Sequence, residues 1–154
     1  MTAPTTGPMA GPTNGPTSTA TPSPAPPPNA RAVVRAYHEA RFRGDVSAAA
    51  ETLADRFRFS SPLMASDGAR EHLAGLEAFL QIVTGVDLVS ELYADTEATL
   101  VYDVHTAVPA IGIQRTAEHF RLTADGRIDS IRLIFDATPW HAVMQAAAAA
   151  AAAH

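Results

Sequence analysis

Apolar residues at the start of the folded region recur at helical spacing. Val33, Tyr37 and Ala40 lie three or four positions apart and follow Asn29, a residue type favoured at helix N-caps. Gly44 marks the end of this predicted helix, because glycine commonly follows the last turn. A second short helix is predicted next, and its capping residue and apolar stripe are Asp45, Val46, Ala49, Ala50 and Leu53.

After the second helix, apolar and polar side chains alternate, so the hydrophobic pattern repeats every two residues. This alternation predicts a strand that ends at Pro62 and carries Phe57, Phe59 and Ser61 on one face. Residues 63–72 read as a loop. Helical spacing resumes up to Gly85, with an apolar stripe formed by Leu76, Phe79, Leu80 and Val83.

Strand-like segments fill the rest of the folded region. We expect strands over residues 86–93, 98–106, 111–122 and 127–135. Asp125 and Gly126 predict the hairpin turn between the last two, since glycine supplies the positive φ that such a turn needs. Three helices followed by an antiparallel meander predict an α+β fold, with the helices covering one face of a curved antiparallel sheet.

Alternation along the strand 98–106 predicts which side chains face the helices. The face that includes Tyr102 and Val104 is bulkier than the opposite one, so we assign it to the interior. Asp103 and His105 then face outward, where a solvated face or contacts across a dimer interface are favoured over a site on the back of the sheet. By the same alternation, Thr116, Glu118, Phe120 and Leu122 share one face of a later strand.

Composition changes sharply at both ends of this domain. Residues 1–30 hold nine of the twelve prolines and no charged residue, which predicts a disordered arm over 1–29; a stalk or a protein-binding tail is the alternative. The domain itself spans 30–140. Thr138 and Pro139 suit a helix start, so residues 141–154, rich in alanine, are expected to form a C-terminal helix or a frayed tail.

Charge and residue counts exclude several function classes. A net charge of −5 with scattered basic residues argues against nucleic acid as a partner. No signal peptide is expected, because residues 1–30 lack the basic start and continuous apolar run of one, and no apolar stretch is long enough to cross a membrane. The lack of cysteine fits the cytoplasm. The six histidines are dispersed and no glycine-rich phosphate loop occurs, so neither a metal nor a cofactor is expected.

Two segments resemble a known superfamily. Residues 33–45 look like the opening helix of ketosteroid isomerases, and residues 118–135, with the turn at Asp125, look like their last hairpin. In order and spacing, residues 30–140 are similar to the nuclear transport factor 2-like superfamily, which includes these isomerases and the SnoaL-like polyketide cyclases. The resemblance implies a cone-shaped roll that encloses an apolar pocket.

The resemblance also implies roles for individual residues. Tyr37 and Glu118 stand where the isomerases have the tyrosine and the buried acid that donate hydrogen bonds to an enolate oxygen. Ser61 stands where the isomerases have their base, and Leu80 stands where they commonly have a second tyrosine. Ordinary ketosteroid isomerase activity is therefore not expected, because a serine hydroxyl cannot abstract a carbon-bound proton without its own base.

The chemistry of Glu118 has two readings. In the first, desolvation keeps its carboxyl neutral, so that Tyr37 and Glu118 together donate hydrogen bonds to a carbonyl or enolate oxygen. In the second, Tyr37 is a core aromatic residue whose hydroxyl is satisfied by a structural Glu118. Of the histidines, His38 is predicted on an exposed face of the first helix, and His72, at the edge of the loop, is a minor candidate for the mouth of the cone.

These features predict a protein that binds a small apolar ligand. The expected ligand is polyketide-, steroid- or terpenoid-like, and the protein would be an isomerase or a cyclase if it is an enzyme. The alternative is a non-catalytic binding or dimerisation module, and a homodimer through the exposed sheet face is expected. The predicted ligand-binding residues are Phe57, Phe59, Ser61, Tyr102, Val104, Phe120, Leu133, Phe135 and Trp140.

Overall fold

The computed structural model describes residues 29–153. The arm predicted for residues 1–29 therefore lies, apart from Asn29, outside the described residues. The elements, in chain order, are α1 (Ala30–Phe42), α2 (Val46–Glu51), β1 (Leu53–Ser60), β2 (Ala65–Asp67), α3 (Ala69–Leu80), β3 (Val83–Tyr93), β4 (Glu97–Thr106), β5 (Ile113–Leu122), β6 (Ile128–Ile134) and α4 (Thr138–Ala152).

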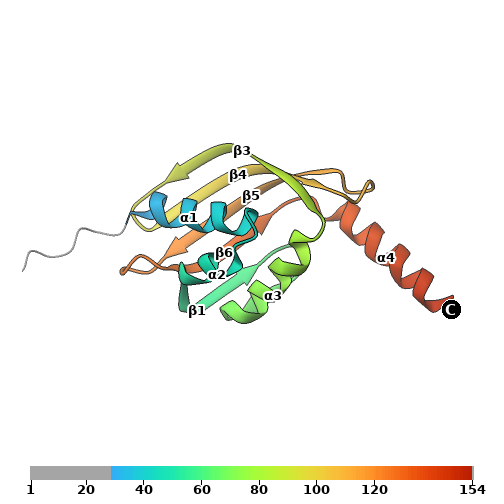
Figure 1. The fold of residues 1–154 in the computed structure, drawn as a ribbon, viewed down its shortest axis with the longest axis horizontal. Helices are drawn as coiled ribbons and strands as arrows, with labels where there is room; N and C mark the ends of the chain where they lie inside the picture. The colour runs from blue at the N-terminus through green and yellow to red at the C-terminus, as the bar shows by residue number, and fades with distance from the viewer. Residues whose placement is uncertain (1–28, 154) are drawn as a thin grey trace, which may run out of the picture.

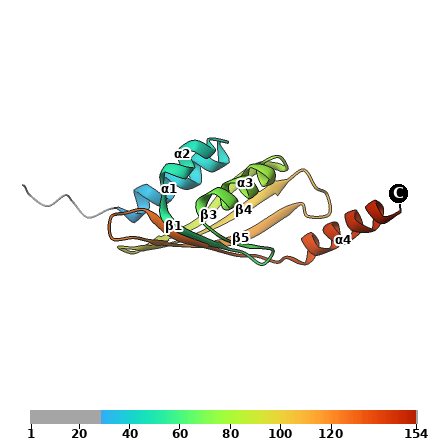
Figure 2. The ribbon, with the colours of Figure 1, turned by 90° about the horizontal axis from the view of Figure 1, so that it is seen from below.

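A curved, unclosed six-stranded sheet forms one layer of the fold, with strand order β2-β1-β6-β5-β4-β3. Helices α1, α2 and α3 lie together on one face of this sheet, whereas α4 extends away from one end of it (Figures 1 and 2). The α+β fold class is confirmed. One detail differs from an all-antiparallel sheet, because β1 pairs with β6 in parallel. Alternation identifies a strand but not its direction, so the sequence did not show this pairing.

The first helix begins and ends, and the second helix begins, where the sequence predicts. The side chain of Asn29 accepts a hydrogen bond from the backbone N–H of Ala32 at 3.4 Å, and Asp45 accepts one from Ala48 at 3.0 Å. Gly44, between the helices, has a φ of 82°, a conformation that costs glycine least. Leu53, which was assigned to the second helix, is instead the first residue of β1.

The prediction of a loop over residues 63–72 is wrong for most of that range. The range contains the short strand β2, and α3 begins within it at Ala69. Neither element has its usual sequence signal. Strand β2 has three residues and buries only Ser66, so no apolar alternation is visible. The N-cap of α3 is Gly68, at a φ of 103°, and it makes no side-chain capping bond.

The core lies between the sheet and the three helices. On β4 the inward side chains of Ala98, Leu100, Tyr102 and Val104 are all buried, which confirms the predicted alternation. Phe57 and Phe120 contribute two of the largest buried side chains, and each stabilises the fold by roughly 1.5–3 kcal/mol through burial.

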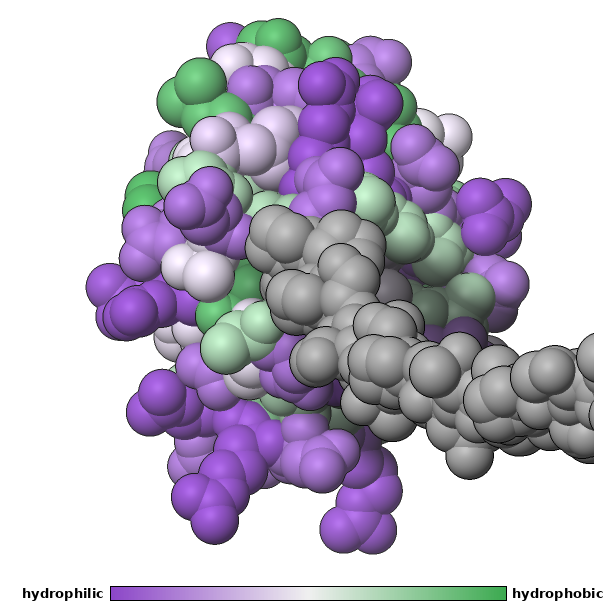
Figure 3. Space-filling model, turned by 90° about the vertical axis from the view of Figure 1, so that its left-hand side faces the viewer, coloured by the Kyte–Doolittle hydropathy of each residue, from purple (hydrophilic) through white to green (hydrophobic). Residues whose placement is uncertain are grey.

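The outer face of the sheet carries cross-strand ion pairs. Asp103 binds Arg115 through two hydrogen bonds, and His105 lies 2.8 Å from Asp87. Asp103 and His105 both face outward, as the alternation along β4 predicts. The end of the molecule at which α1 begins, opposite α4, shows mainly hydrophilic side chains with apolar ones scattered among them (Figure 3). No helix in the described part of the chain is long and apolar enough to span a bilayer.

Candidate functional site

A cavity of about 330 Å³ lies between the sheet and α3. Its walls come from α1, α3 and the inward faces of the strands, at the end of the sheet from which α4 leaves (Figure 1). The lining is largely apolar. Its polar and ionisable members are Arg41, Ser61, His72, Tyr102, Gln114, Thr116 and Trp140.

Most of the side chains predicted to contact a ligand line this cavity. They are Phe59, Ser61, Tyr102, Val104, Leu133, Phe135 and Trp140. Phe57 and Phe120 do not line it, because both are packed completely into the core. Alternation identified their face correctly but could not show how far along that face the cavity extends.

Tyr37 lies behind the cavity wall. Its side chain is fully buried, and its hydroxyl oxygen lies 2.7 Å from Nε2 of His72. No hydrogen bond joins it to Glu118 among the described residues, so the second reading of this pair is wrong about the partner of the hydroxyl. Burial raises the pKa of Tyr37 well above its usual value, which keeps the phenol protonated.

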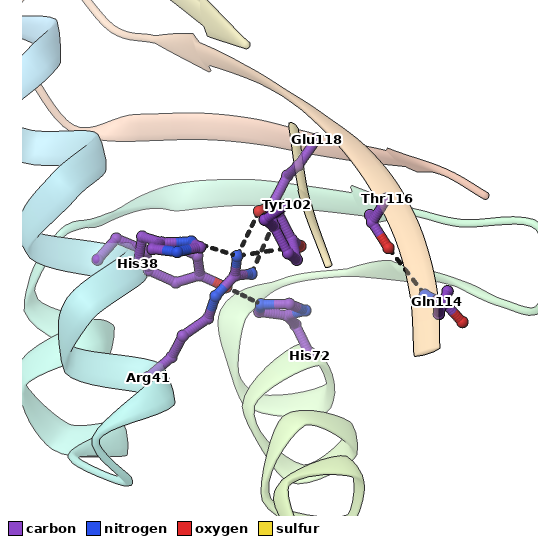
Figure 4. Close-up of polar contacts among 8 residues, drawn as sticks. His38, Arg41, His72, Tyr102, Gln114, Thr116 and Glu118 are labelled. Carbon is purple, nitrogen blue, oxygen red and sulfur yellow. Dashed lines mark hydrogen bonds and ion pairs between the residues drawn. The ribbon is translucent and has the colours of Figure 1, made fainter. Parts of the chain in front are cut away.

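Glu118 is also fully buried, and it pairs with Arg41. The guanidinium donates to both carboxylate oxygens, with 2.7 Å between Nη1 and Oε1, while the Tyr102 hydroxyl donates to Oε2 at 2.9 Å (Figure 4). A carboxyl held by a guanidinium in this two-point geometry is an ionised acceptor. The expectation of a neutral, donating Glu118 is therefore wrong, because it omitted Arg41.

Arg41 is the functional-region residue that sequence reasoning missed. It lies four positions after Tyr37 on α1 and so shares the inward face of that helix, which was the available signal. Its guanidinium lies 4.8 Å from the centre of the Tyr37 ring and 4.7 Å from that of Phe42, and Nη2 donates to the Tyr102 hydroxyl at 3.2 Å. Only its Nε is left without a hydrogen-bond partner among the described residues.

His38 is buried rather than exposed. Its Nδ1 accepts a hydrogen bond from Nη2 of Arg41 at 3.1 Å, and its ring packs against those of Phe42 and Tyr102. Burial, followed by the positive charges of Arg41 and Arg35, lowers the pKa of His38 to about 3. The prediction failed because His38 belongs to the same buried stripe of α1 as its neighbours, four positions after Val34 and three before Arg41.

His72 lies in the cavity wall. The sequence made it only a candidate for the mouth of the cone. It is on α3, is only 5% exposed, and packs its ring against Phe57 and Phe59 with centroid distances of 5.0 and 4.4 Å. Burial and the charge of Arg41 lower the pKa of His72 to about 4. The imidazole is therefore neutral at physiological pH.

A second polar group lies on β5 and at the start of α4. Nε2 of Gln114 donates to Oγ1 of Thr116 at 2.8 Å (Figure 4), and Nε1 of Trp140 donates to Oε1 of Gln114. The Trp140 ring also packs against Phe79, at a centroid distance of 6.1 Å. Both polar atoms of the Gln114 amide are thereby used within the protein.

The hydroxyl of Ser61 is used for hydrogen bonds within its own turn. This hydroxyl accepts from the backbone N–H groups of Leu63 and Met64 and donates to the Met64 carbonyl at 3.2 Å, so it stabilises the turn after β1. Among the described residues that line the cavity there is no aspartate or glutamate. Within the same part of the chain, no group of three or more His, Cys, Asp or Glu side chains is arranged to hold a metal ion.

Comparison with solved structures places this architecture among known proteins. A protein from Kribbella flavida is 34% identical in sequence and matches with a TM-score of 0.68. The match covers 75% of this chain and 93% of the Kribbella protein. The two proteins belong to one family. No family model matches the chain, and no curated protein matches it significantly.

More distant structures identify the fold. A nuclear transport factor 2-like protein from Cytophaga hutchinsonii is 19% identical with a TM-score of 0.63, over 74% of this chain and 96% of that one. A steroid delta-isomerase from Pseudomonas aeruginosa is 18% identical with a TM-score of 0.63, over 81% and 95% of the two chains. The family shared with the Kribbella protein therefore has the nuclear transport factor 2-like fold, as the resemblance implied.

Proposed function

We propose that this protein binds a small, mainly apolar molecule in the cavity beside α3. The observation that carries the proposal is the cavity itself: a largely apolar space of about 330 Å³ with a few polar groups at defined positions. Sites for small molecules have this composition, since apolar walls supply affinity and a few polar groups fix orientation. A polyketide-, steroid- or terpenoid-like skeleton suits such walls.

The titratable side chains in the cavity wall favour binding over catalysis. Arg41 is occupied by Glu118, and the Tyr102 hydroxyl already donates to that carboxylate. His72 is the lining residue that is an unprotonated base at neutral pH, but a pKa near 4 makes it weak. A general base works best when its pKa lies near the working pH. A binding protein without its own chemistry is therefore the function that these residues support best.

An isomerase or cyclase is the second candidate, and one observation favours it. His72 combines a neutral imidazole with a place in the cavity wall, so its free N–H group could polarise a carbonyl of the ligand. The likeness to a steroid delta-isomerase supports only a shared fold, because a serine, Ser61, stands at the position where the isomerases have their base. In either function Tyr37 and Glu118 act from behind the wall, through His72 and Arg41.

The single tryptophan gives a direct assay for binding. Trp140 lines the cavity, so a molecule that enters should change its fluorescence, and no other tryptophan contributes to the signal. We would titrate the full chain with cyclic ketones and substituted phenols. Micromolar binding of at least one of them is expected.

A blocked cavity is the matched test of location. Gly75 lines the cavity on α3, and a Cβ there meets only the Met64 side chain at 3.7 Å, so Gly75→Leu should fold while filling space. Ala74→Leu adds a similar side chain at the exposed neighbouring position, outside the cavity lining. We expect Gly75→Leu to weaken binding at least tenfold and Ala74→Leu to leave it unchanged. If no compound binds the unaltered chain, or if both variants bind equally well, the proposed function is wrong.

A further inference from the structure

We propose that His72 presents its Nδ1–H group to the cavity as the hydrogen-bond donor for an acceptor oxygen of the ligand, and that Tyr37 fixes this tautomer from behind. The inference rests on the proposed function and adds the chemical class of the ligand: an uncharged apolar molecule that carries a carbonyl or similar acceptor oxygen. It assigns His72 a direct contact and makes Tyr37 a positioning residue.

The first step is the proton of the Tyr37 hydroxyl. This hydroxyl is fully buried, and Nε2 of His72, at 2.7 Å, is the acceptor that the described residues offer it. Arg41 lies over the Tyr37 ring, but a guanidinium only donates. If Nε2 carried a proton, the phenol proton would lose its acceptor, and a buried unsatisfied donor costs about 1–3 kcal/mol. The phenol therefore donates, and Nε2 accepts.

The second step follows from the neutral state of the imidazole. Burial and the Arg41 charge lower the pKa of His72 to about 4, so the ring carries one proton at neutral pH. A neutral imidazole that accepts at one nitrogen must hold its proton on the other. The Tyr37 contact thus sets the Nδ1–H tautomer of His72.

The third step concerns the surroundings of Nδ1. No hydrogen bond to this atom occurs in the described part of the chain, and it is not among the buried atoms that lack a partner, which are Nε of Arg41 and Oγ of Ser66. Since His72 lines the cavity, its remaining exposed surface opens there. In the view of Figure 4, the His72 ring lies below the contacts of Arg41 with Glu118, and the Thr116–Gln114 pair lies to its right.

Charge around His72 decides the ligand class. The positive charge of Arg41 is balanced by Glu118 through two hydrogen bonds, so the inner end of the cavity has no unpaired charge to attract an anion. A cationic ligand would lose its hydration beside Arg41 and face an N–H donor, which is unfavourable. An uncharged acceptor such as a ketone, lactone or ester satisfies Nδ1–H without burying a charge.

Two measurements on the full chain test this inference. Nitrogen-15 NMR of the labelled imidazoles, with the His72 signals assigned by loss in His72→Gln, should show a protonated Nδ1 and an unprotonated Nε2. In Tyr37→Phe this preference should weaken, which a merely structural role of Tyr37 would not produce. Tyr93→Phe is the control, because the Tyr93 hydroxyl bonds to Glu91 at 2.9 Å on β3, away from the cavity lining. A protonated Nε2 of His72 in the unaltered chain would overturn the inference, regardless of the result of the binding measurements.

The second measurement compares a bicyclic ketone with the hydrocarbon of the same carbon skeleton, by Trp140 fluorescence. We expect the ketone to bind at least tenfold more tightly, equivalent to about 1.4 kcal/mol. Tyr37→Phe should reduce this ratio at least threefold, and Tyr93→Phe should not change it. Equal affinities for the two compounds would overturn the role of His72 and leave the proposed function standing. Failure of both compounds to bind would overturn this inference, whereas the proposed function falls only if every other cyclic ketone and phenol in the titration also fails to bind.

Discussion

Arg41 and Glu118 form a two-point ion pair across 77 residues of sequence, and both side chains are excluded from solvent. The pair joins α1 to β5 at the cavity wall, where Arg41 belongs to the lining and Glu118 lies behind it, and the Tyr102 hydroxyl adds a third donor to the same carboxylate. A buried pair of this kind contributes little net stability compared with apolar residues of equal size. Its consequence is positional: it fixes α1, and with it Tyr37, relative to the sheet.

Removing one charge of this pair should destabilise the protein strongly. Glu118→Gln leaves the Arg41 guanidinium buried without its counter-charge, and breaking buried pairs in this way costs about 3–5 kcal/mol. We expect the midpoint of urea unfolding to fall accordingly. Asp103→Asn breaks the exposed pair with Arg115 on the outer sheet face and serves as the control, with only a small expected change. Similar midpoints for the two variants would contradict a structural role of the buried pair.

A double replacement separates charge burial from packing. Arg41→Met with Glu118→Leu removes both charges and keeps apolar volume, so it should recover much of the stability lost in Glu118→Gln. The remaining loss would come from the Tyr102 and His38 bonds that Arg41 and Glu118 no longer satisfy. If the double variant is less stable than Glu118→Gln, the ion pair itself supplies the stability.

Acid should destabilise the fold through two histidines. The pKa is lowered from 6.5 to about 4 in His72 and to about 3 in His38, in both cases mainly by burial. As the pH falls below 6.5, the unfolded chain takes up protons that the folded chain refuses, so stability falls. Each histidine contributes up to about 1.4 kcal/mol per pH unit until the pH reaches its folded pKa.

Substitution of each histidine identifies its share of this slope. Urea unfolding of the full chain at intervals between pH 7 and pH 5 gives the slope. His72→Gln and His38→Gln should each make it shallower, while His141→Gln, at an exposed position on α4, should leave it unchanged. A slope that none of the buried-site variants alters would show that other groups cause the acid sensitivity.

The cavity walls were predictable from sequence because they depend on strand parity. Phe59, Tyr102, Val104 and Leu133 lie at alternate positions of their strands with the other bulky side chains of the inward face, and this parity fixes which face each one occupies. The buried polar network was not predictable in the same way. Periodicity cannot show that Arg41 meets Glu118, because arginine normally remains solvated and the pairing depends on how α1 crosses the sheet.

The position of His72 was obscured by the start of its helix. Gly68 provides no side-chain cap, so the sequence showed α3 only from its later apolar stripe and left His72 in a loop. Once α3 begins at Ala69, His72 lies one turn before Leu76, and both residues are buried. The contact between Tyr37 and His72 follows from that helix and not from the family resemblance.

Helix α4 should contribute to stability only through its first turn. None of its residues is buried, but Trp140 packs against Phe79 and donates to Gln114. Deleting residues 146–154 should change the free energy of unfolding by less than about 0.5 kcal/mol. Trp140→Ala should lower it by about 1–2 kcal/mol, since it removes an apolar contact and a hydrogen bond. Circular dichroism in urea measures both, and a large loss on truncation would contradict this division.

The outer sheet face should form a homodimer. Three large apolar side chains on that face are exposed, namely Leu92 on β3, Ile113 on β5 and Ile134 on β6, and a second copy that covers the face would remove them from water. A two-fold interface brings the same patch of both copies together, so one charged substitution counts twice. Ile134→Arg should therefore weaken the dimer at least tenfold in analytical ultracentrifugation. Met144→Arg makes the same kind of change at an exposed position of α4 and should have no effect. A monomer at high protein concentration, or a dimer indifferent to Ile134→Arg, would rule out this face as the interface.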